Sequence, residues 1–142
     1  MKLTEQFSTE ESKLLSKEYR GEVLAQKCPS REVLKHMTSQ WGILVLLVLR
    51  IRMHRFSELR RAIEGVSERM LAQTLQLLEV DGLVERVAYD VVPPHVEYSL
   101  TPLGQEAAEK VKDLTDWIEI NLPEIMENQE NRSDNRPKNR AK

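Results

Sequence analysis

Residues 66–100 read VSERMLAQTLQLLEVDGLVERVAYDVVPPHVEYSL, and their apolar side chains change at Gly82 from a helical period to a strand period. Before Gly82, leucines recur at positions i, i+4 and i+7 behind Ser67, a residue type that caps helices well. This spacing predicts a helix. After Gly82 the period is two, which predicts paired strands over residues 83–89 and 96–100.

The segments on either side of this stretch are mostly helical in pattern. Residues 41–52 are apolar nearly all round and predict a central buried helix. Further helices are predicted over residues 9–27, 31–37, 56–64 and 103–121, and Pro123 should kink or end the last one. Helices followed by a β-hairpin form the winged-helix arrangement. The expected fold is therefore mainly α with a small β-hairpin: a winged helix-turn-helix domain with N- and C-terminal dimerisation helices.

The chain is expected to divide into three parts. Residues 1–27 form an N-terminal helical arm, and residues 28–126 a winged-helix DNA-binding domain with a C-terminal dimerisation helix. Residues 127–142 are polar and are expected to be a disordered tail. The 142 residues suit a single domain.

Composition argues against several classes of protein. One cysteine allows no internal disulfide. The longest apolar run, residues 43–49, has seven residues, whereas a membrane span needs about 20, so we expect a cytoplasmic protein that does not enter a membrane. The histidines lack metal-ligand spacing, and no phosphate loop or catalytic triad stands out. We therefore expect no metal, no cofactor and no enzyme activity.

Charge is unevenly distributed along the chain. The formal net charge is −2, but residues 50–61 hold five arginines and one acid, whereas residues 99–126 hold six acids and two lysines. Phosphate contacts need a local positive field rather than a positive total. The arginine cluster therefore favours a nucleic-acid surface, and its alternative is a solvated face without a ligand.

The helix of residues 67–80 carries a polar stripe besides its leucines. Arg69, Gln73 and Gln76 recur at i, i+4 and i+7, and such side chains read base edges in the DNA major groove, which admits one α-helix. The candidate DNA-contacting residues are Ser67, Arg69, Gln73, Thr74, Gln76, Arg60, Arg61, Arg55, Arg86 and His95. We predict a sequence-specific regulator that binds double-stranded DNA. The alternative is a winged-helix module that binds another protein.

Some of these candidates have a purely structural alternative. Thr74 is expected to be half packed against the body. Arg60 and Arg61 have the alternative of surface ion pairs with Glu58 or Glu64. The tyrosines of the hairpin are expected to pack rather than to stack on bases.

Six blocks of the sequence occur in the order found in a known family. They read CPS at 28–30, WGIL at 41–44, FSELRR at 56–61, VSERML at 66–71, LEVDGLV at 78–84 and YDVVPPHVEYSLTPLG at 89–104. Over about residues 28–120 the chain resembles the HxlR-type transcriptional regulators, which are distantly similar to MarR regulators. The resemblance implies a homodimeric repressor or activator whose terminal helices make the dimer. Many members have arginine where this chain has His95 in the wing.

Two apolar stripes lie outside the expected core and favour a homodimer. The candidate interface residues are Leu14, Leu15, Tyr19, Leu24, Leu114, Trp117 and Ile118. A two-fold dimer would place two copies of the helix 67–80 about one DNA turn apart, and so read a palindromic operator with half-sites about 10 bp apart. The alternative is that the N-terminal arm folds back on its own domain.

Cys28 is the one residue with candidate chemistry. It lies just before a predicted helix, whose dipole favours a thiolate. Some HxlR-type regulators sense oxidants or electrophiles through a cysteine at this place, so the resemblance makes Cys28 a candidate redox sensor. Without a second cysteine it could form only an intersubunit disulfide, a mixed disulfide or an adduct. The alternative is a buried, inert thiol. An oxidant or small-molecule effector is thus a candidate partner, although no residue identifies a ligand.

Overall fold

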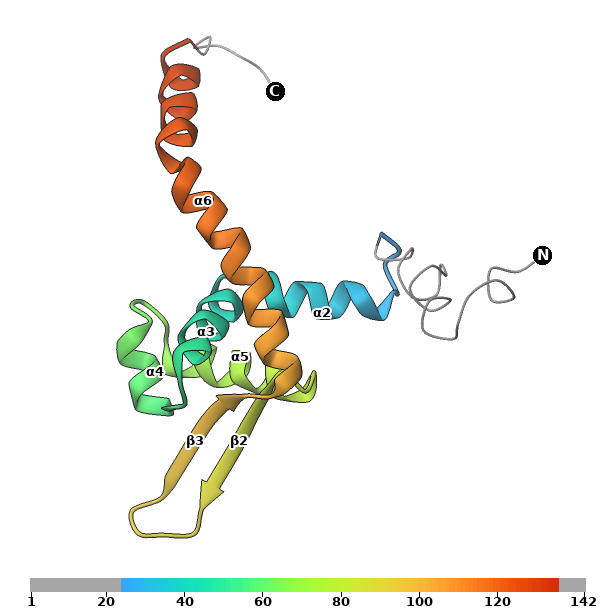
Figure 1. The fold of residues 1–142 in the computed structure, drawn as a ribbon, viewed down its shortest axis with the longest axis vertical. Coiled ribbons are helices and arrows are strands. Elements are labelled where there is room, and N and C mark those ends of the chain that lie inside the picture. The colour runs from blue at the N-terminus through green and yellow to red at the C-terminus, as the bar shows by residue number, and fades with distance from the viewer. Residues whose placement is uncertain (1–23, 136–142) are drawn as a thin grey trace, which may run out of the picture.

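The computed structural model describes residues 24–135, which form a helical body, a β-hairpin extending from it and a long helix that leaves it in the opposite direction (Figure 1). The elements are α2 (Pro29–Thr38), α3 (Gln40–Ile51), β1 (His54–Arg55), α4 (Phe56–Ala62), α5 (Glu68–Val80), β2 (Val84–Tyr89), β3 (His95–Leu100) and α6 (Pro102–Asn135). This order confirms the predicted winged helix-turn-helix fold.

Helix α3 lies at the centre of the body. Its residues Val45, Leu46 and Leu49 are at most 1% exposed and pack in one core with Leu75 of α5 and Val111 of α6. Because α3 is apolar on nearly every side, it can accept neighbours on several faces at once. The predicted central buried helix is therefore confirmed, and it positions α5, β3 and α6 around itself.

The sheet has three antiparallel strands in the order β1-β3-β2. The predicted hairpin is present as β2 and β3, with Val84 opposite Leu100 and Tyr89 opposite His95. The sequence pattern does not predict β1, because a strand of two residues is too short to alternate visibly. By pairing with β3, β1 ties the start of α4 to the hairpin.

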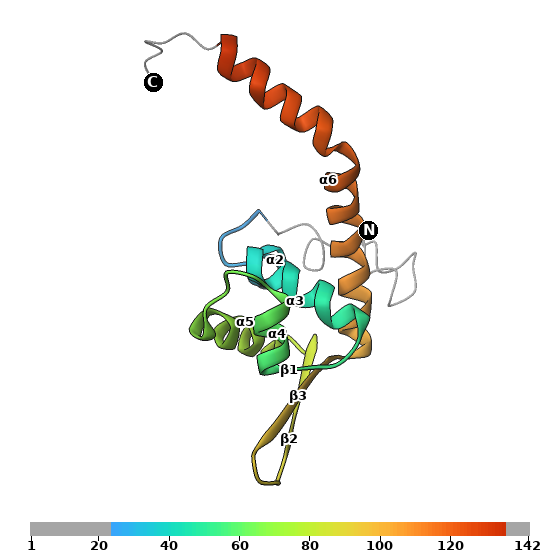
Figure 2. The same ribbon diagram turned by 90° about the vertical axis from the view of Figure 1, so that its left-hand side faces the viewer.

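The last helix is longer than the sequence predicts. Helix α6 runs to Asn135, so the expected end near Asn121 is wrong, and so is the disorder expected from residue 127 as far as residue 135. A polar segment can extend a helix that is already nucleated, because each added residue gains a hydrogen bond without a new nucleus. Pro123 lies inside α6, whose upper part changes direction in Figure 2, as expected where a proline removes one hydrogen bond.

Parts of the expected termini fall outside the described residues. These parts are the arm up to residue 23 and the last seven residues, 136–142. Residues 24–27 form turns instead of the end of the predicted helix 9–27. Within residues 24–135, no helix is both long and apolar enough to cross a membrane.

Candidate nucleic-acid interface

A short turn sets the angle between α4 and α5. Gly65 has a φ of 90°, a left-handed conformation that side chains with a Cβ rarely adopt, and Ile63 and Val66 anchor the turn in the core. Ser67 Oγ then accepts a hydrogen bond from the Met70 N–H at 3.0 Å. The predicted capping by Ser67 is confirmed, and this cap fixes where α5 begins.

The outer face of α5 carries the predicted polar stripe. The leucines on the inner face are at most 1% exposed, whereas Arg69, Gln73 and Gln76 are all exposed. None of the three makes a side-chain hydrogen bond or an ion pair within residues 24–135. Met70 and Ala72, which the pattern assigns to no site, are exposed beside them. Helix α5 therefore presents a ridge of unengaged amide and guanidinium groups.

Thr74 lies on the opposite side of α5. It is 7% exposed and follows Leu71 by three residues on the leucine face. At helical spacing such a residue points into the body. The structure therefore corrects the prediction that Thr74 contacts DNA.

The two arginines at the end of α4 lie beside the start of α5. Arg60 Nη1 is 3.8 Å from Glu68 Oε2, and both side chains are largely exposed, so the pair is weak. Glu58, an alternative partner in sequence, instead accepts the Arg55 N–H at 2.8 Å, and this bond is the main cause of its lowered pKa. Arg61 is exposed and forms no ion pair in the described part of the chain.

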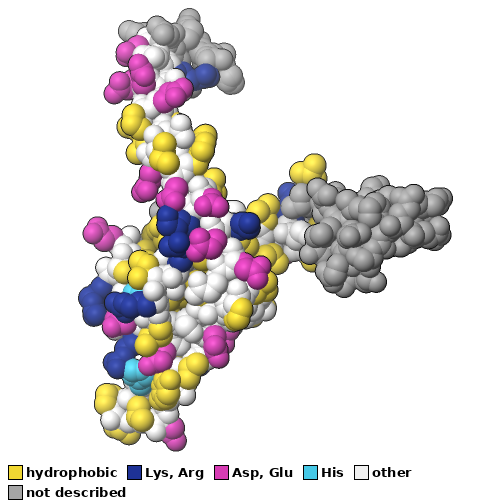
Figure 3. Space-filling model, in the orientation of Figure 1, with side chains coloured by type: hydrophobic (Ala, Val, Ile, Leu, Met, Phe, Trp, Pro, Cys, Tyr) yellow, Lys and Arg dark blue, Asp and Glu magenta, His cyan; other side chains and the backbone are white. Residues whose placement is uncertain are grey.

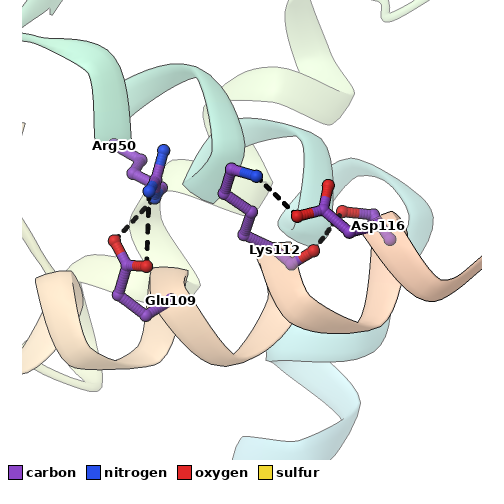
Figure 4. Close-up of polar contacts among 5 residues, drawn as sticks. Arg50, Glu109, Lys112 and Asp116 are labelled. Atoms are coloured by element: carbon purple, nitrogen blue, oxygen red, sulfur yellow. Dashed lines mark hydrogen bonds and ion pairs between the residues drawn. The ribbon is translucent and has the colours of Figure 1, made fainter.

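Arg50 belongs to a different contact from the other arginines of its cluster. Its Nε and Nη2 donate to the two carboxylate oxygens of Glu109 at 2.6 and 3.3 Å, joining α3 to α6 (Figure 4). This bond raises the pKa of Arg50 and lowers that of Glu109. Beside it, Lys112 Nζ lies 2.6 Å from Asp116 Oδ2. The arginine cluster is therefore divided, because Arg50 binds α6 rather than facing α5.

The hairpin β2–β3 with its connecting residues 90–94 is called the wing below, and its two faces differ. Residues opposite each other in an antiparallel pair share a face. Arg86 is opposite Tyr98 on the face towards α5, where it lines a hollow of about 300 Å³ with Gln76. Arg55 and His95 lie on the other face. Of the candidates in the sheet, only Arg86 lies on the same side as α5.

The wing carries little positive charge. His95 Nε2 is 2.6 Å from Glu97 Oε2, so its ring is already engaged. The tip is apolar: Val92 is 98% exposed and Val91 is 52% exposed. At the lower end of Figure 3 the tip is mostly yellow and white, with a carboxylate and no cation on the face drawn. The cationic part of the candidate interface is therefore the α4–α5 pair.

The described members of the expected dimer interface are at the surface. Leu114, Trp117 and Ile118 of α6 are 45%, 59% and 40% exposed, and Leu24 is 89% exposed. Leu14, Leu15 and Tyr19 lie outside the described residues. The apolar stripe continues along α6 beyond the body with Leu122 and Met126, both more than 40% exposed.

Cys28 directly precedes α2 and is buried, with 9% of its surface exposed. Its backbone N–H donates to Ala25 O at 3.1 Å, and its own carbonyl accepts from Arg31 at 3.0 Å. The predicted position at a helix start is confirmed. In the single chain the thiol is thus shielded from solvent.

The fold and its exposed helix define the class of the protein. Helices α4 and α5 are a helix-turn-helix, and the hairpin behind them is its wing. Proteins of this architecture place the second helix of the pair in the DNA major groove.

Comparison with known proteins gives the family. The family model described as HxlR-like helix-turn-helix matches residues 36–126. The uncharacterized HTH-type transcriptional regulator YtfH of Escherichia coli is 66% identical over 106 residues, which cover 75% of this chain and 84% of that protein. The chain belongs to the HxlR-like helix-turn-helix family of transcriptional regulators, which is not a family of enzymes.

Two solved structures are similar over most of their own length. The transcriptional regulator YtfH of Salmonella typhimurium has a TM-score of 0.74 at 62% identity and covers 76% of this chain and 96% of its own. The redox regulator HypR in its reduced form has a TM-score of 0.65 at 33% identity and covers 70% and 98%. Both likenesses agree with the resemblance drawn from the sequence blocks.

Proposed function

We propose that this chain is a sequence-specific regulator that reads double-stranded DNA through the outer face of α5. The observation that carries the proposal is the unengaged ridge of Arg69, Gln73 and Gln76. Arginine pairs with guanine edges and glutamine with adenine edges in the major groove. The leucine face underneath holds the helix rigidly, so the ridge can enter a groove without rearrangement.

Backbone phosphates are contacted by the neighbouring cations. Arg61 is exposed, and Arg60 has only a weak partner to give up. The N-terminus of α5 adds its own positive dipole end. These groups adjoin the start of α5, so they fit the phosphates that border the groove in which α5 lies.

The functional unit is a homodimer that binds a palindromic operator. The apolar stripe on α6, with Leu114, Trp117 and Ile118, is exposed in the single chain and is long enough to pair with a second copy. Two-fold symmetry then places two α5 helices about one DNA turn apart, with half-sites about 10 bp apart. A single species with the mass of one chain in light scattering at low micromolar concentration would contradict the dimer.

Electrophoretic titration against specific and random DNA tests the proposal. Arg69→Ala and Gln73→Ala should each lose roughly 1–3 kcal/mol of preference for the specific site. Gln129→Ala is the matched control, because Gln129 is an exposed glutamine on α6, away from α5. If both α5 variants discriminate between the two DNAs as the wild type does, α5 is not the reading element.

A role as a protein-binding module is the second candidate. The observation that favours it is the apolar, cation-poor tip of the wing with its exposed Val92. Under this alternative, random and chosen DNA fragments would bind equally weakly, and the α5 variants would not change that binding.

We further propose that DNA binding is regulated through Cys28. It is supported by the likeness to HypR, which is described as a redox regulator, and by the place of Cys28 before α2. With diamide as oxidant, two Cys28 thiols of a dimer would lose two protons and two electrons to diamide and form one intersubunit disulfide. Mass spectrometry of the treated protein, paired with DNA titration, tests this. Unaltered DNA affinity of a fully modified protein would contradict it.

A further inference from the structure

One carboxylate in the wing binds side chains from both strands of the hairpin. Glu97 lies on the middle strand β3 with its side chain only 24% exposed. Its Oε2 is 2.6 Å from His95 Nε2, and its Oε1 accepts the Tyr89 hydroxyl at 3.2 Å. Arg55 of β1 is directly opposite Glu97 in the sheet register. Glu97 therefore joins both strands of the wing and faces the strand that precedes α4.

The groups bound by Glu97 form the last rung before the wing tip. Tyr89 and His95 are the final register pair of β2 and β3, and their rings meet edge to face with centroids 5.2 Å apart. Beyond them come Val91 and Val92, which are exposed and have no core to hold them. The wing projects from the body in Figure 2. A hairpin without a packed face is marginally stable by itself, so its outer half needs another source of order.

The pKa shifts of Glu97 and Tyr89 agree with a charged Glu97 carboxylate that binds its two neighbours. The hydrogen bond from His95 is the main cause of a lowered pKa of Glu97, with smaller contributions from Tyr89 and from the charge of Arg55. The same carboxylate raises the pKa of the Tyr89 hydroxyl, chiefly through its charge. Charge-assisted hydrogen bonds are stronger than neutral ones.

We propose that Glu97 is a positioning residue for DNA recognition, because its bonds to Tyr89 and His95 fix the outer half of the wing. Glu97 contacts no DNA itself, and its negative charge opposes DNA binding. Its effect comes through Tyr89 and His95, which it holds in one arrangement. This inference rests on the proposed DNA-binding function, and it adds that an acid within the wing favours specific binding despite its charge.

The sign of the effect separates positioning from simple charge. Glu97→Gln removes one negative charge, so electrostatics alone would strengthen binding to any DNA. Glu85→Gln is the matched control, because Glu85 is exposed on the same sheet face and makes no side-chain hydrogen bond or ion pair in residues 24–135. Any charge effect therefore occurs in both variants, and a positioning effect only in Glu97→Gln.

The experiment has two readouts on the full-length protein. Hydrogen exchange of the wing amides without DNA should be faster in Glu97→Gln than in wild type and Glu85→Gln. The ratio of specific to random DNA affinity should fall about tenfold in Glu97→Gln relative to Glu85→Gln, the equivalent of one charge-assisted hydrogen bond. His95→Ala should behave similarly, whereas His95→Gln, which retains an N–H donor, should restore much of the ratio.

The outcomes distinguish the two proposals. If the hydrogen exchange of the wing amides in Glu97→Gln equals that of wild type, Glu97 does not order the wing, whatever the DNA result. Faster exchange with an affinity ratio equal to that of Glu85→Gln overturns the positioning role and leaves only a structural contact. If wild-type protein shows no preference for any DNA, the proposed function fails. The hydrogen-exchange measurement still reports whether Glu97 orders the wing.

Discussion

Replacing Arg61 tests where the phosphate-contacting charge lies. Arg61 is exposed and forms no ion pair in the described residues, so its whole charge is available to a phosphate. Each phosphate contact adds about 0.9 to the slope of log affinity against log salt concentration, so a dimer of Arg61→Gln should lose about 1.8. Between 50 and 200 mM salt, wild-type affinity should therefore fall about twelvefold more than that of the variant.

Arg50→Gln is the matched control for this measurement. It removes the same formal charge from the same cluster, but the Arg50 guanidinium is occupied by Glu109. Its salt slope should therefore equal that of wild type. Titrations by fluorescence anisotropy at several salt concentrations give the slopes. If Arg61→Gln has the wild-type salt slope, or if both variants lose the same amount of slope, the reasoning is refuted that Arg61 faces DNA while Arg50 is bound to α6.

Three predictions concern stability and can be checked by thermal or denaturant unfolding. Ser67→Ala should cost about 1 kcal/mol, because it removes the N-cap of α5; an unchanged midpoint would contradict the cap. Gly104→Ala should destabilise strongly, because a Cβ there would collide with the Leu83 carbonyl oxygen where α6 begins; full wild-type stability would contradict this close approach. Glu109 has a lowered pKa through Arg50, so its contribution is present at neutral pH and lost as the pH falls through the carboxyl range. Glu109→Gln should flatten the acid limb of the stability profile, and an identical limb would show that the ion pair contributes nothing.

The fold could be predicted because local pattern and tertiary packing agree in residues 41–100. Leu71, Leu75 and Leu78 of α5 repeat at helical spacing and are buried, and the strands after Gly82 pair as their alternation indicates. Gly82 itself has a φ of 79°, which explains why the period changes there. Where side-chain pattern alone determines the buried face, the sequence is sufficient.

The errors arose where pattern carries no information about neighbours. Strand β1 is defined by hydrogen bonding to β3, which two residues cannot signal. Helix α6 continues into a polar segment because it is already nucleated. Arg50 and Arg61 look equivalent in sequence, and only the place of Glu109 on α6 separates them.

The candidate site likewise has features that the sequence could predict and features that it could not. The stripe of α5 follows from spacing within one helix, and its exposure was predictable. Thr74 was misassigned because it lies at the edge of the leucine face, where one step of rotation decides burial. The role inferred for Glu97 depends on strand pairing, although the alternation that places it on the same sheet face as His95 and Tyr89 is visible once the register is known.

Selection of bound DNA from a random pool tests most directly whether the outer face of α5 reads sequence. The wild-type protein should enrich a palindrome with half-sites about 10 bp apart, and Arg69→Ala should lose preference at one base pair in each half-site. A pool without enrichment, or the same palindrome selected by wild type, Arg69→Ala and Gln73→Ala alike, would contradict the account.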